Sequence, residues 1–454
     1  MFPSFQTRVA DARRCGDLYF ATLLPQETIQ RVFGEASQKL DSARVYNTAI
    51  TVWTFLTQAL SIHHACTLAV TKLNVYRIAS GLRGCSTNTG AYCIARDKLD
   101  EDGMHRLVTH TGEAVDKQAP EAWRWKDRRV IAADGATVTM ADTPENQAAY
   151  PQQKQQRRGC GFPIMRLVAF FSLASGVALE VAMGKYKGKL TAEVSLFREI
   201  DHIIGENDVF LGDRCYSGWF DVARLMGRGA DVVVRKHQAR KTDFRRGIRY
   251  GKEEHAVHWD KPQRPPWMSE EEYATYPDSI ILRELKVRVA TPGFRTRELI
   301  IVTSLLDDIE YDKEAIADLY RRRWQAELNL RSLKTVMQMD HLRCKTPHRV
   351  RNELRAHLAA YNLIRQVMCE AAMAGGVVPW HISFKGALTT LVETLPVLAA
   401  IPDADTFCRV LFECCLTHVV GHRPDRYEPR VVKRRPKSYK LMNKPRRSYK
   451  PGNE

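Results

Sequence analysis

The sequence predicts an α/β protein in which helical regions flank a sheet-containing core. Helical periodicity dominates the first 125 residues, strand-like and helix-like segments alternate after them, and long helical patterns return near the C-terminus. We expect five parts: a helical N-terminal domain (1–125), the first part of the core (126–235), a β-rich insertion (236–296), the second part of the core (297–375), and a C-terminal helical region with a basic tail (376–454).

The N-terminal region contains two stretches of helical character. Residues 47–73 form a long apolar-periodic run, and residues 86–110 begin with Ser, Thr and Asn, which commonly cap helices, before a second run. Arg77, Arg83 and Arg96 lie around the connection between the two runs. The region is therefore consistent with a small helical bundle or with a domain that binds DNA ends.

The first part of the core begins with strand-like segments. Residues 128–142 form a β-type run with an Asp-Gly step in its middle, and residues 165–184 predict two strands joined by a Ser-Gly turn. Residues 189–200 have a helical pattern that includes Glu193, and residues 207–235 predict strand, loop, helix and strand in that order. This alternation predicts strands that run in mixed directions.

The second part of the core follows an interruption. Residues 236–296 contain charge runs, a Pro/Trp-rich segment and the alternating stretch ILRELKVRVA, so we expect an insertion of β character. The chain then returns to a buried strand over 297–307. A helix is predicted from about Asp312, and another long helix over 348–371.

Composition excludes several classes of protein. Hydrophobic residues make up 44% of the chain and charged residues 27%, values typical of a soluble globular protein. No apolar stretch approaches the roughly 20 residues that span a membrane, and the first residues lack the apolar core of a signal peptide. The 11 cysteines form no CxxC pair and no zinc-type spacing with histidine, so reduced thiols are expected. These observations predict a cytoplasmic protein.

The charge of the chain predicts a polyanionic partner. The formal net charge is +17 and the pI is about 9.4. From residue 421 to residue 454 there are 12 Lys/Arg against 3 Asp/Glu, so +9 of the +17 lies in this basic tail. A solubilising end would also be basic, but the prolines, the tyrosines and the triplet Lys433-Arg434-Arg435 favour an extended segment that contacts phosphates.

The stretch YRRRWQAELNLRSLK, residues 320–334, aligns four polar side chains on one predicted helix face. At about 100° per residue, the side chains fall within a stripe about 60° wide beside a buried apolar arc. They are Tyr320, Arg323, Glu327 and Lys334. A solvated helix would scatter its charges around the outside, so we expect this stripe to line a groove.

Two aspartates follow buried strand patterns and could lie opposite Glu327. Asp134 closes the run VIAAD and Asp213 closes VFLGD, which places both at a sheet edge where sites form in α/β folds. Each acid alone is better explained by a turn, a cap or an ion pair. Three carboxylates in one pocket would repel one another unless a cation neutralised them, and ligands that are all oxygen favour Mg²⁺ or Mn²⁺.

The spacing Y-x2-R-x3-E-x6-K formed by these four residues resembles the signature of DDE transposases of the insertion-sequence-four family. The stretch ADGATVTMADTPEN resembles the first aspartate block of that family, and FLGDRCYSGWF resembles the second. The blocks occur in the expected order, and the resemblance covers roughly residues 40–435.

The resemblance implies an RNase H-like catalytic core interrupted by a β-rich insertion, and cut-and-paste DNA transposition. It assigns Asp134, Asp213 and Glu327 as the catalytic triad and as ligands of Mg²⁺, with Mn²⁺ as a substitute. Two ions roughly 3.5–4 Å apart would serve both hydrolysis and strand transfer.

The resemblance also implies residues that contact DNA. Tyr320, Arg323 and Lys334 would hold DNA near the cleaved end, and Arg214 directly follows the second aspartate as in the family. A tryptophan of the insertion would stack on a flipped base, with Trp259 and Trp267 as the candidates. For each tryptophan, packing within the insertion is the alternative.

The implied partner is double-stranded DNA, both as inverted-repeat transposon ends and as target, bound by a homodimer in a synaptic complex. Such a protein would work in the bacterial cytoplasm at the nucleoid and would need no membrane. Two alternatives stay open: a DNA-binding derivative that has lost catalysis, and a Mg²⁺-dependent RNase H-like nuclease that needs no paired ends.

Overall fold

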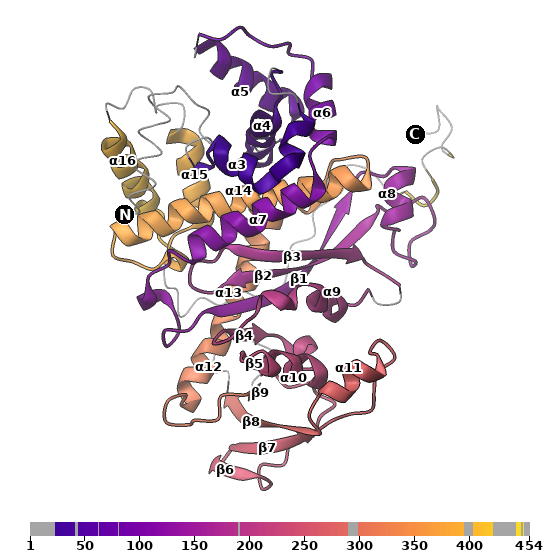
Figure 1. The fold of residues 1–454 in the computed structure, drawn as a ribbon, viewed down its shortest axis with the longest axis vertical. Helices are drawn as coiled ribbons and strands as arrows, with labels where there is room; N and C mark the ends of the chain where they lie inside the picture. Colours follow the sequence, from indigo (N-terminus) through magenta and orange to yellow (C-terminus); the bar gives the residue numbers. More distant parts are fainter. Residues whose placement is uncertain are drawn as a thin grey trace.

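The computed structural model has helices at both ends of the sequence and a mixed sheet between them (Figure 1). None of the helices in the described part of the chain combines the length and the apolar content that crossing a bilayer requires. The structure describes residues 23–40, 44–61, 63–79, 81–188, 191–288, 298–394, 403–420, 442–445 and 448.

The N-terminal region is helical, as predicted, but each of the two predicted runs is divided. Asn47 accepts a hydrogen bond from the backbone N–H of Ile50 and begins one helix, while Asp100 accepts one from Gly103 and begins another. The elements are α3 (Gln26–Phe33), η1 (Gly34–Lys39), α4 (Thr48–Leu60), α5 (Cys66–Ala79), α6 (Gly90–Asp97), α7 (Glu101–Asp116) and η2 (Glu121–Trp123).

The strands form one mixed sheet in the order β3-β2-β1-β4-β5-β9-β8-β7-β6 within the described ranges. Strand β1 runs antiparallel to β2 and parallel to β4, and β4 runs parallel to β5. The order β3-β2-β1-β4-β5 with these directions confirms the predicted RNase H-like core. The bounds are β1 (Val130–Met140), β2 (Ile164–Ser172), β3 (Ala178–Lys185), β4 (Val209–Gly212), β5 (Asp231–Arg235), β6 (Ile248–Gly251), β7 (Glu254–Asp260), β8 (Ser279–Arg288), β9 (Glu298–Thr303) and β10 (His341–Leu342), which pairs with β1.

The insertion has the predicted β character, and its strands do not form a separate sheet. Strands β6, β7 and β8 continue the core sheet through β9, which pairs antiparallel with both β5 and β8 (Figure 1). A short helix, α11 (Glu270–Thr275), lies between β7 and β8. The insertion is therefore joined to the core by continuous backbone hydrogen bonding.

Helices around the sheet position the segments that carry the candidate residues. After β1 comes α8 (Pro144–Ala149), and after β3 comes α9 (Glu193–Ile200), within the helix predicted over 189–200. Strand β4 leads into η4 (Arg214–Tyr216) and α10 (Trp219–Gly227). Arg198 and Arg224 pair with Asp221, and Arg224 also pairs with Asp201 in η3 (Asp201–Ile203), so α9 and α10 are tied together.

The glutamate helix begins where predicted but is not continuous. Asp312 caps α12 (Lys313–Arg322), and α13 (Trp324–Arg331) follows after Arg323. The next turn, η5 (Ser332–Val336), is π-helical. The prediction of one regular α-helix through residue 334 is therefore wrong, because the π turn changes the helical spacing before Lys334.

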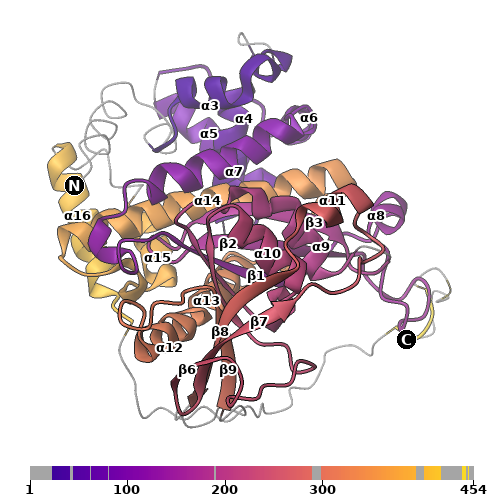
Figure 2. The ribbon, with the colours of Figure 1, turned by 60° about the horizontal axis from the view of Figure 1, so that its bottom comes forward.

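Helix α14 (Pro347–Ala374) connects the core to both helical regions. Figure 2 shows it running between the N-terminal helices and the sheet. Its buried Asn362 accepts from the N–H of Ala178 and donates to the carbonyl oxygens of Ala178 and Val108, so it joins β3 to α7. The elements that follow α14 in the chain are η6 (Pro379–His381), α15 (Phe384–Thr394) and α16 (Ala404–Thr417).

The hairpin between β2 and β3 requires glycine at its turn. Gly176 has φ +74°, and a Cβ there would lie 1.7 Å from the guanidinium of Arg365 on α14. The carbonyl oxygen of Gly176 accepts from Tyr361 at 2.7 Å and from Arg365 at 3.0 Å. The turn thereby docks the sheet edge onto α14.

We expect Asn362→Ala to lower the free energy of unfolding by about 1–3 kcal/mol, because it leaves the buried N–H and carbonyl of Ala178 without their side-chain partner. Urea unfolding measures the change. Gln30→Ala, on the exposed face of α3, is the control and should change the value by less than about 0.5 kcal/mol. Equal effects of the two variants would contradict the bridging role of Asn362.

Candidate active site

The register of β1 and β4 places the two predicted aspartates side by side. Ala132 pairs with Leu211 in this parallel ladder; two residues further along the chain come Asp134, within β1, and Asp213, directly after the end of β4. Neighbouring strands lie about 4.8 Å apart, so the two carboxylates start from adjacent backbones.

The prediction that Asp134 closes its strand is wrong. Strand β1 continues to Met140, paired with β2 and then β10, whereas β4 ends at Gly212. Asp134 therefore lies within β1, at the point where its β4 neighbour has ended.

Asp134 is partly buried and lies close to other acids. Its Oδ1 accepts a hydrogen bond of 3.0 Å from the backbone N–H of Gly135. Burial raises the pKa of Asp134 from 3.8 to about 7; repulsion from Glu327 adds to the rise and the Arg323 guanidinium opposes it. The predicted proximity of Asp134 and Glu327 is thus present, and repulsion by Glu327 contributes to the raised pKa of Asp134.

Glu327 is held by the arginine one turn before it. The Arg323 guanidinium donates to Oε1 of Glu327 at 2.6 Å. Tyr320 is buried behind this pair, with its ring centroid 5.9 Å from Cζ of Arg323, and burial raises the pKa of Tyr320 to about 12. The phenol of Tyr320 therefore packs beneath the arginine instead of lying open in the cavity.

A cavity of about 650 Å³ lies between β1 and the glutamate helix. Asp134, Glu327 and Lys334 line it, so the structure brings together predicted residues that lie 193 and 200 positions apart in sequence. The remaining lining residues are Gly135, Ala136, Thr137, Arg166, Glu193, Leu330, Arg331 and Thr335. Carboxylates and cations thus share the walls of one cavity.

Three of these charged residues are not among the predicted site residues. Arg331 falls about 20° from Tyr320 at 100° per residue, so the stripe itself could have revealed it. Glu193 lies on a predicted helix whose pattern gives no sign of its neighbours. Arg166 lies on β2 opposite Thr137 of β1, a pairing that the sequence does not specify.

The second aspartate is engaged by its own loop. Oδ1 of Asp213 accepts from the N–H of Arg214 at 2.7 Å and so begins η4. The exposed Arg214 side chain donates to Gln238 of the insertion at 3.1 Å. Lys433, Arg434 and Arg435 of the basic tail lie outside the described residues.

The two candidate tryptophans pack within the protein. Trp259 is 5% exposed, donates from Nε1 to Glu284, and has the Arg240 guanidinium 4.0 Å above its ring. The Arg198 guanidinium lies 3.6 Å from the ring centroid of Trp267. An arginine therefore lies over one face of each ring, as the packing alternative expects, and base stacking by either tryptophan stays a prediction.

The donor groups suit a hard divalent ion, although they do not form a closed cluster. The acids around Asp134 offer carboxylate oxygens, and the raised pKa of Asp134 comes first from burial and then from repulsion by Glu327. Within the described ranges, no three Asp, Glu, His or Cys side chains are gathered closely enough to hold an ion. Oε1 of Glu327 accepts a hydrogen bond from Arg323.

Acids and cations on the walls of one cavity suit a phosphodiester backbone, because the cations attract the phosphates that the acids alone would repel. On an RNase H-like sheet, this arrangement defines the class of proteins that process nucleic-acid strands. The chain belongs to the transposases whose family model is described as "Transposase DDE domain", which matches residues 125–363.

One known transposase resembles the chain over most of its length, and a second resembles a shorter part of it. Transposase InsG for insertion sequence element IS4 of Escherichia coli (strain K12) is 28% identical over 361 residues, 76% of each chain. The putative transposase InsL for insertion sequence element IS186A of the same organism is 40% identical over 70 residues, 15% of this chain and 19% of the relative. The predicted resemblance to DDE transposases of the insertion-sequence-four type is confirmed.

A solved structure with an overall likeness is the piggyBac transposase synaptic complex with hairpin DNA, determined by cryo-EM. The TM-score is 0.42 and the sequence identity 10%, with 92% of this chain and 88% of that chain covered.

The raised pKa of Asp134 predicts how stability depends on pH. Because the folded state favours the protonated acid, ionisation of Asp134 opposes folding, and this loss of stability grows from about pH 4 to pH 7 and then levels. Asp134→Asn removes the loss. We expect the free energy of unfolding of the variant to be higher than that of the unchanged chain by about 1–3 kcal/mol at pH 8, after allowance for solvent screening. At pH 5 the difference should be smaller.

Urea unfolding in EDTA at the two pH values measures this difference. Asp308→Asn, at an exposed acid, is the control and should change the free energy of unfolding by less than about 0.5 kcal/mol at either pH. A stability gain of Asp134→Asn that is the same at pH 5 and pH 8 would contradict the prediction.

Proposed function

We propose that the chain cuts DNA at inverted-repeat transposon ends and transfers the freed strands into target DNA. The observation that carries the proposal is the shared cavity of Asp134 and Glu327, with Arg166, Arg331 and Lys334 on its walls, in a member of a transposase family. Such a protein would act where a bacterial chromosome lies, in the cytoplasm at the nucleoid.

Asp134, Asp213 and Glu327 would hold the divalent ion. Mg²⁺ is the proposed ion, with Mn²⁺ as a substitute and two ions for each site, because carboxylate oxygens prefer hard cations. When bound, the ions supply a lowered pKa for the attacking hydroxyl or water and neutralise charge on the leaving 3′ oxygen.

Arg323 would couple DNA binding to the release of Glu327. It now donates to Glu327 at 2.6 Å, and a DNA phosphate offers the same guanidinium an alternative partner of equal or greater charge. Exchange of the carboxylate for the phosphate would free Glu327 for the ion. Tyr320, packed beside Arg323, would keep the guanidinium aimed at the cavity.

The remaining cations would hold DNA along the same surface. Lys334 and Arg331 follow Glu327 on the helix, and Arg214 follows Asp213, so each acid has a phosphate-binding side chain close to it in sequence. Two copies of the chain would pair two transposon ends as a homodimer in the synaptic complex, and the triplet beginning at Lys433 would contact the DNA backbone.

Substitution of the triad should separate cleavage from binding. We expect Asp134→Asn, Asp213→Asn and Glu327→Gln each to lower the rate of strand cleavage by at least about a thousandfold and to leave DNA affinity within about threefold. Cleavage of labelled DNA that carries the repeats flanking this gene measures the rate of strand cleavage. Fluorescence anisotropy of the same DNA measures the affinity.

Asp308→Asn is the matched control and should cut at the rate of the unchanged chain. Cleavage by a purified triple variant of Asp134, Asp213 and Glu327 would overturn the assignment. An unchanged chain that binds the repeats without cutting them would identify the derivative that has lost catalysis. Cutting of DNA without repeats at an equal rate would identify the nuclease.

The basic tail should contribute to the salt dependence of DNA binding. Replacement of Lys433, Arg434 and Arg435 by glutamine removes three cations, and we expect the slope of log K against log [salt] to become shallower by up to about 2.7, or about 0.9 for each phosphate that is no longer neutralised. Anisotropy titrations between about 50 and 200 mM salt measure the slope. An unchanged slope would show that the triplet does not bind DNA.

A further inference from the structure

We propose that Glu193 is a fourth carboxylate of the divalent-ion site, held in place by Tyr216. This inference rests on the proposed function, since it adds a residue to the site that Asp134, Asp213 and Glu327 would form. Glu193 lines the same cavity as Asp134.

Helix α9 directs Glu193 toward the sheet. Glu193 is the first residue of α9, and the residues three and four positions later, Leu196 and Phe197, are buried in the core. Side chains at these spacings share one helix face, so the buried face of α9 begins with Glu193. Arg166 of β2 donates to the carbonyl oxygen of Thr191 at 2.9 Å and fixes the approach to the helix.

The carboxylate of Glu193 is anchored through one oxygen. Oε1 accepts a hydrogen bond of 2.7 Å from the Tyr216 hydroxyl and a longer one of 3.7 Å from the Cys215 thiol. Tyr216 itself is 1% exposed, so its position is fixed by packing. The second oxygen, Oε2, accepts no hydrogen bond from any described residue, and both oxygens lie beside Gly135 of β1.

Glycine at position 135 makes room for this carboxylate. A Cβ at Gly135 would lie 2.3 Å from Cδ and 2.5 Å from Oε2 of Glu193, closer than real atoms approach. Gly135 has no positive φ that would otherwise call for glycine. The residue next to Asp134 is therefore small because Glu193 occupies the space beside it.

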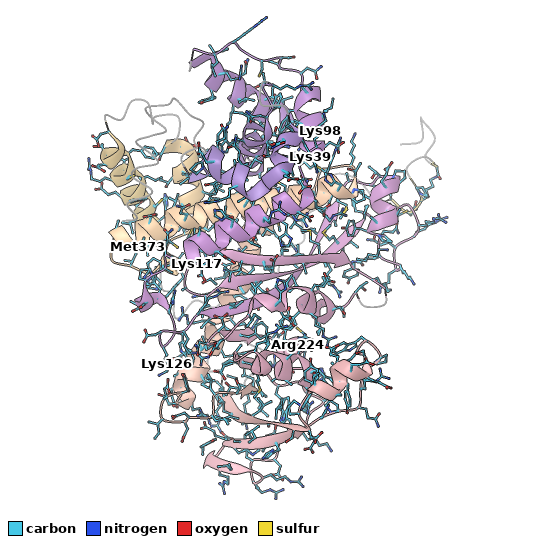
Figure 3. All side chains as sticks on the ribbon, in the orientation of Figure 1. Lys39, Lys98, Lys117, Lys126, Arg224 and Met373 are labelled. Carbon is cyan, nitrogen blue, oxygen red and sulfur yellow. The ribbon has the colours of Figure 1, made fainter. Side chains whose placement is uncertain are left out.

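Ion pairs between α9 and α10 keep Glu193 and Tyr216 together. Arg198 of α9 donates to Asp221 of α10 at 2.6 Å, and Arg224 of α10 pairs with Asp201. Figure 3 labels Arg224 among the side chains of this region. The segment that carries Tyr216 is thus fastened to the helix that carries Glu193.

A purely structural role leaves the charge of Glu193 unexplained. Its partners, Tyr216 and Cys215, are neutral, and no Lys, Arg or His in the described ranges lies within ion-pair distance of it. A carboxylate beside Asp134 that forms no ion pair of its own is unfavourable unless a ligand balances its charge. A divalent ion near Oε2 would supply that balance.

An isothermal calorimetric titration of the metal-free protein with Mn²⁺, in the absence of DNA, tests the inference. We expect Glu193→Gln to weaken Mn²⁺ binding at least about tenfold, as would Gly135→Ala by displacing the carboxylate. Tyr216→Phe, which removes the anchor alone, should weaken binding by a smaller factor. Glu145→Gln, at an exposed acid of α8, is the control and should bind as the unchanged chain does.

Urea unfolding in EDTA establishes that each variant is folded. If Gly135→Ala does not fold, the test relies on Glu193→Gln alone. Asp134→Asn serves as the reference. Wild-type Mn²⁺ affinity in Glu193→Gln, with weakened affinity in Asp134→Asn, would overturn the role of Glu193 and leave the proposed function standing. Wild-type affinity in both variants would overturn the ion site of the proposed function as well.

Discussion

The pairing of β1 with its neighbours is the constraint on which the candidate site depends. The parallel ladder with β4 brings Asp134 and Asp213 onto adjacent backbones. The far half of β1 pairs with β10, which follows the glutamate helix, and the N–H of Thr139 donates to the carbonyl oxygen of Asp340. One strand therefore positions the first aspartate, the second aspartate directly after β4, and the C-terminal end of the segment that carries Glu327.

Charge balance within the cavity depends on arginine and lysine as much as on the acids. Asp134 and Glu327 repel each other, and Arg323 reduces this repulsion by pairing with Glu327. Arg331 and Lys334 line the same cavity and form no ion pair among the described residues. They are thus free to attract phosphates. For Arg323, a phosphate would compete with the Glu327 carboxylate for the same guanidinium.

Features that are local and periodic can be predicted from the sequence. The glutamate helix is predicted from about Asp312, which caps it, and the buried strands before Asp213 and after the insertion lie where they are expected. Tertiary pairing decides the rest. Strand β1 runs past Asp134 because β2 and β10 continue its ladder, and Glu193 gains its position from Tyr216, 23 residues away. Neither interaction leaves a periodic signal.

The insertion is coupled to the second aspartate through its backbone and side chains. Its strands extend the core sheet, and Trp219 of α10 donates from Nε1 to the carbonyl oxygen of Trp259 on β7. Arg214, next to Asp213, donates to Gln238 at the start of the insertion. The insertion is therefore fastened to the segment that follows Asp213, because its strands continue the sheet through β9 to β5, and Gln238 and Trp259 accept hydrogen bonds from Arg214 and Trp219.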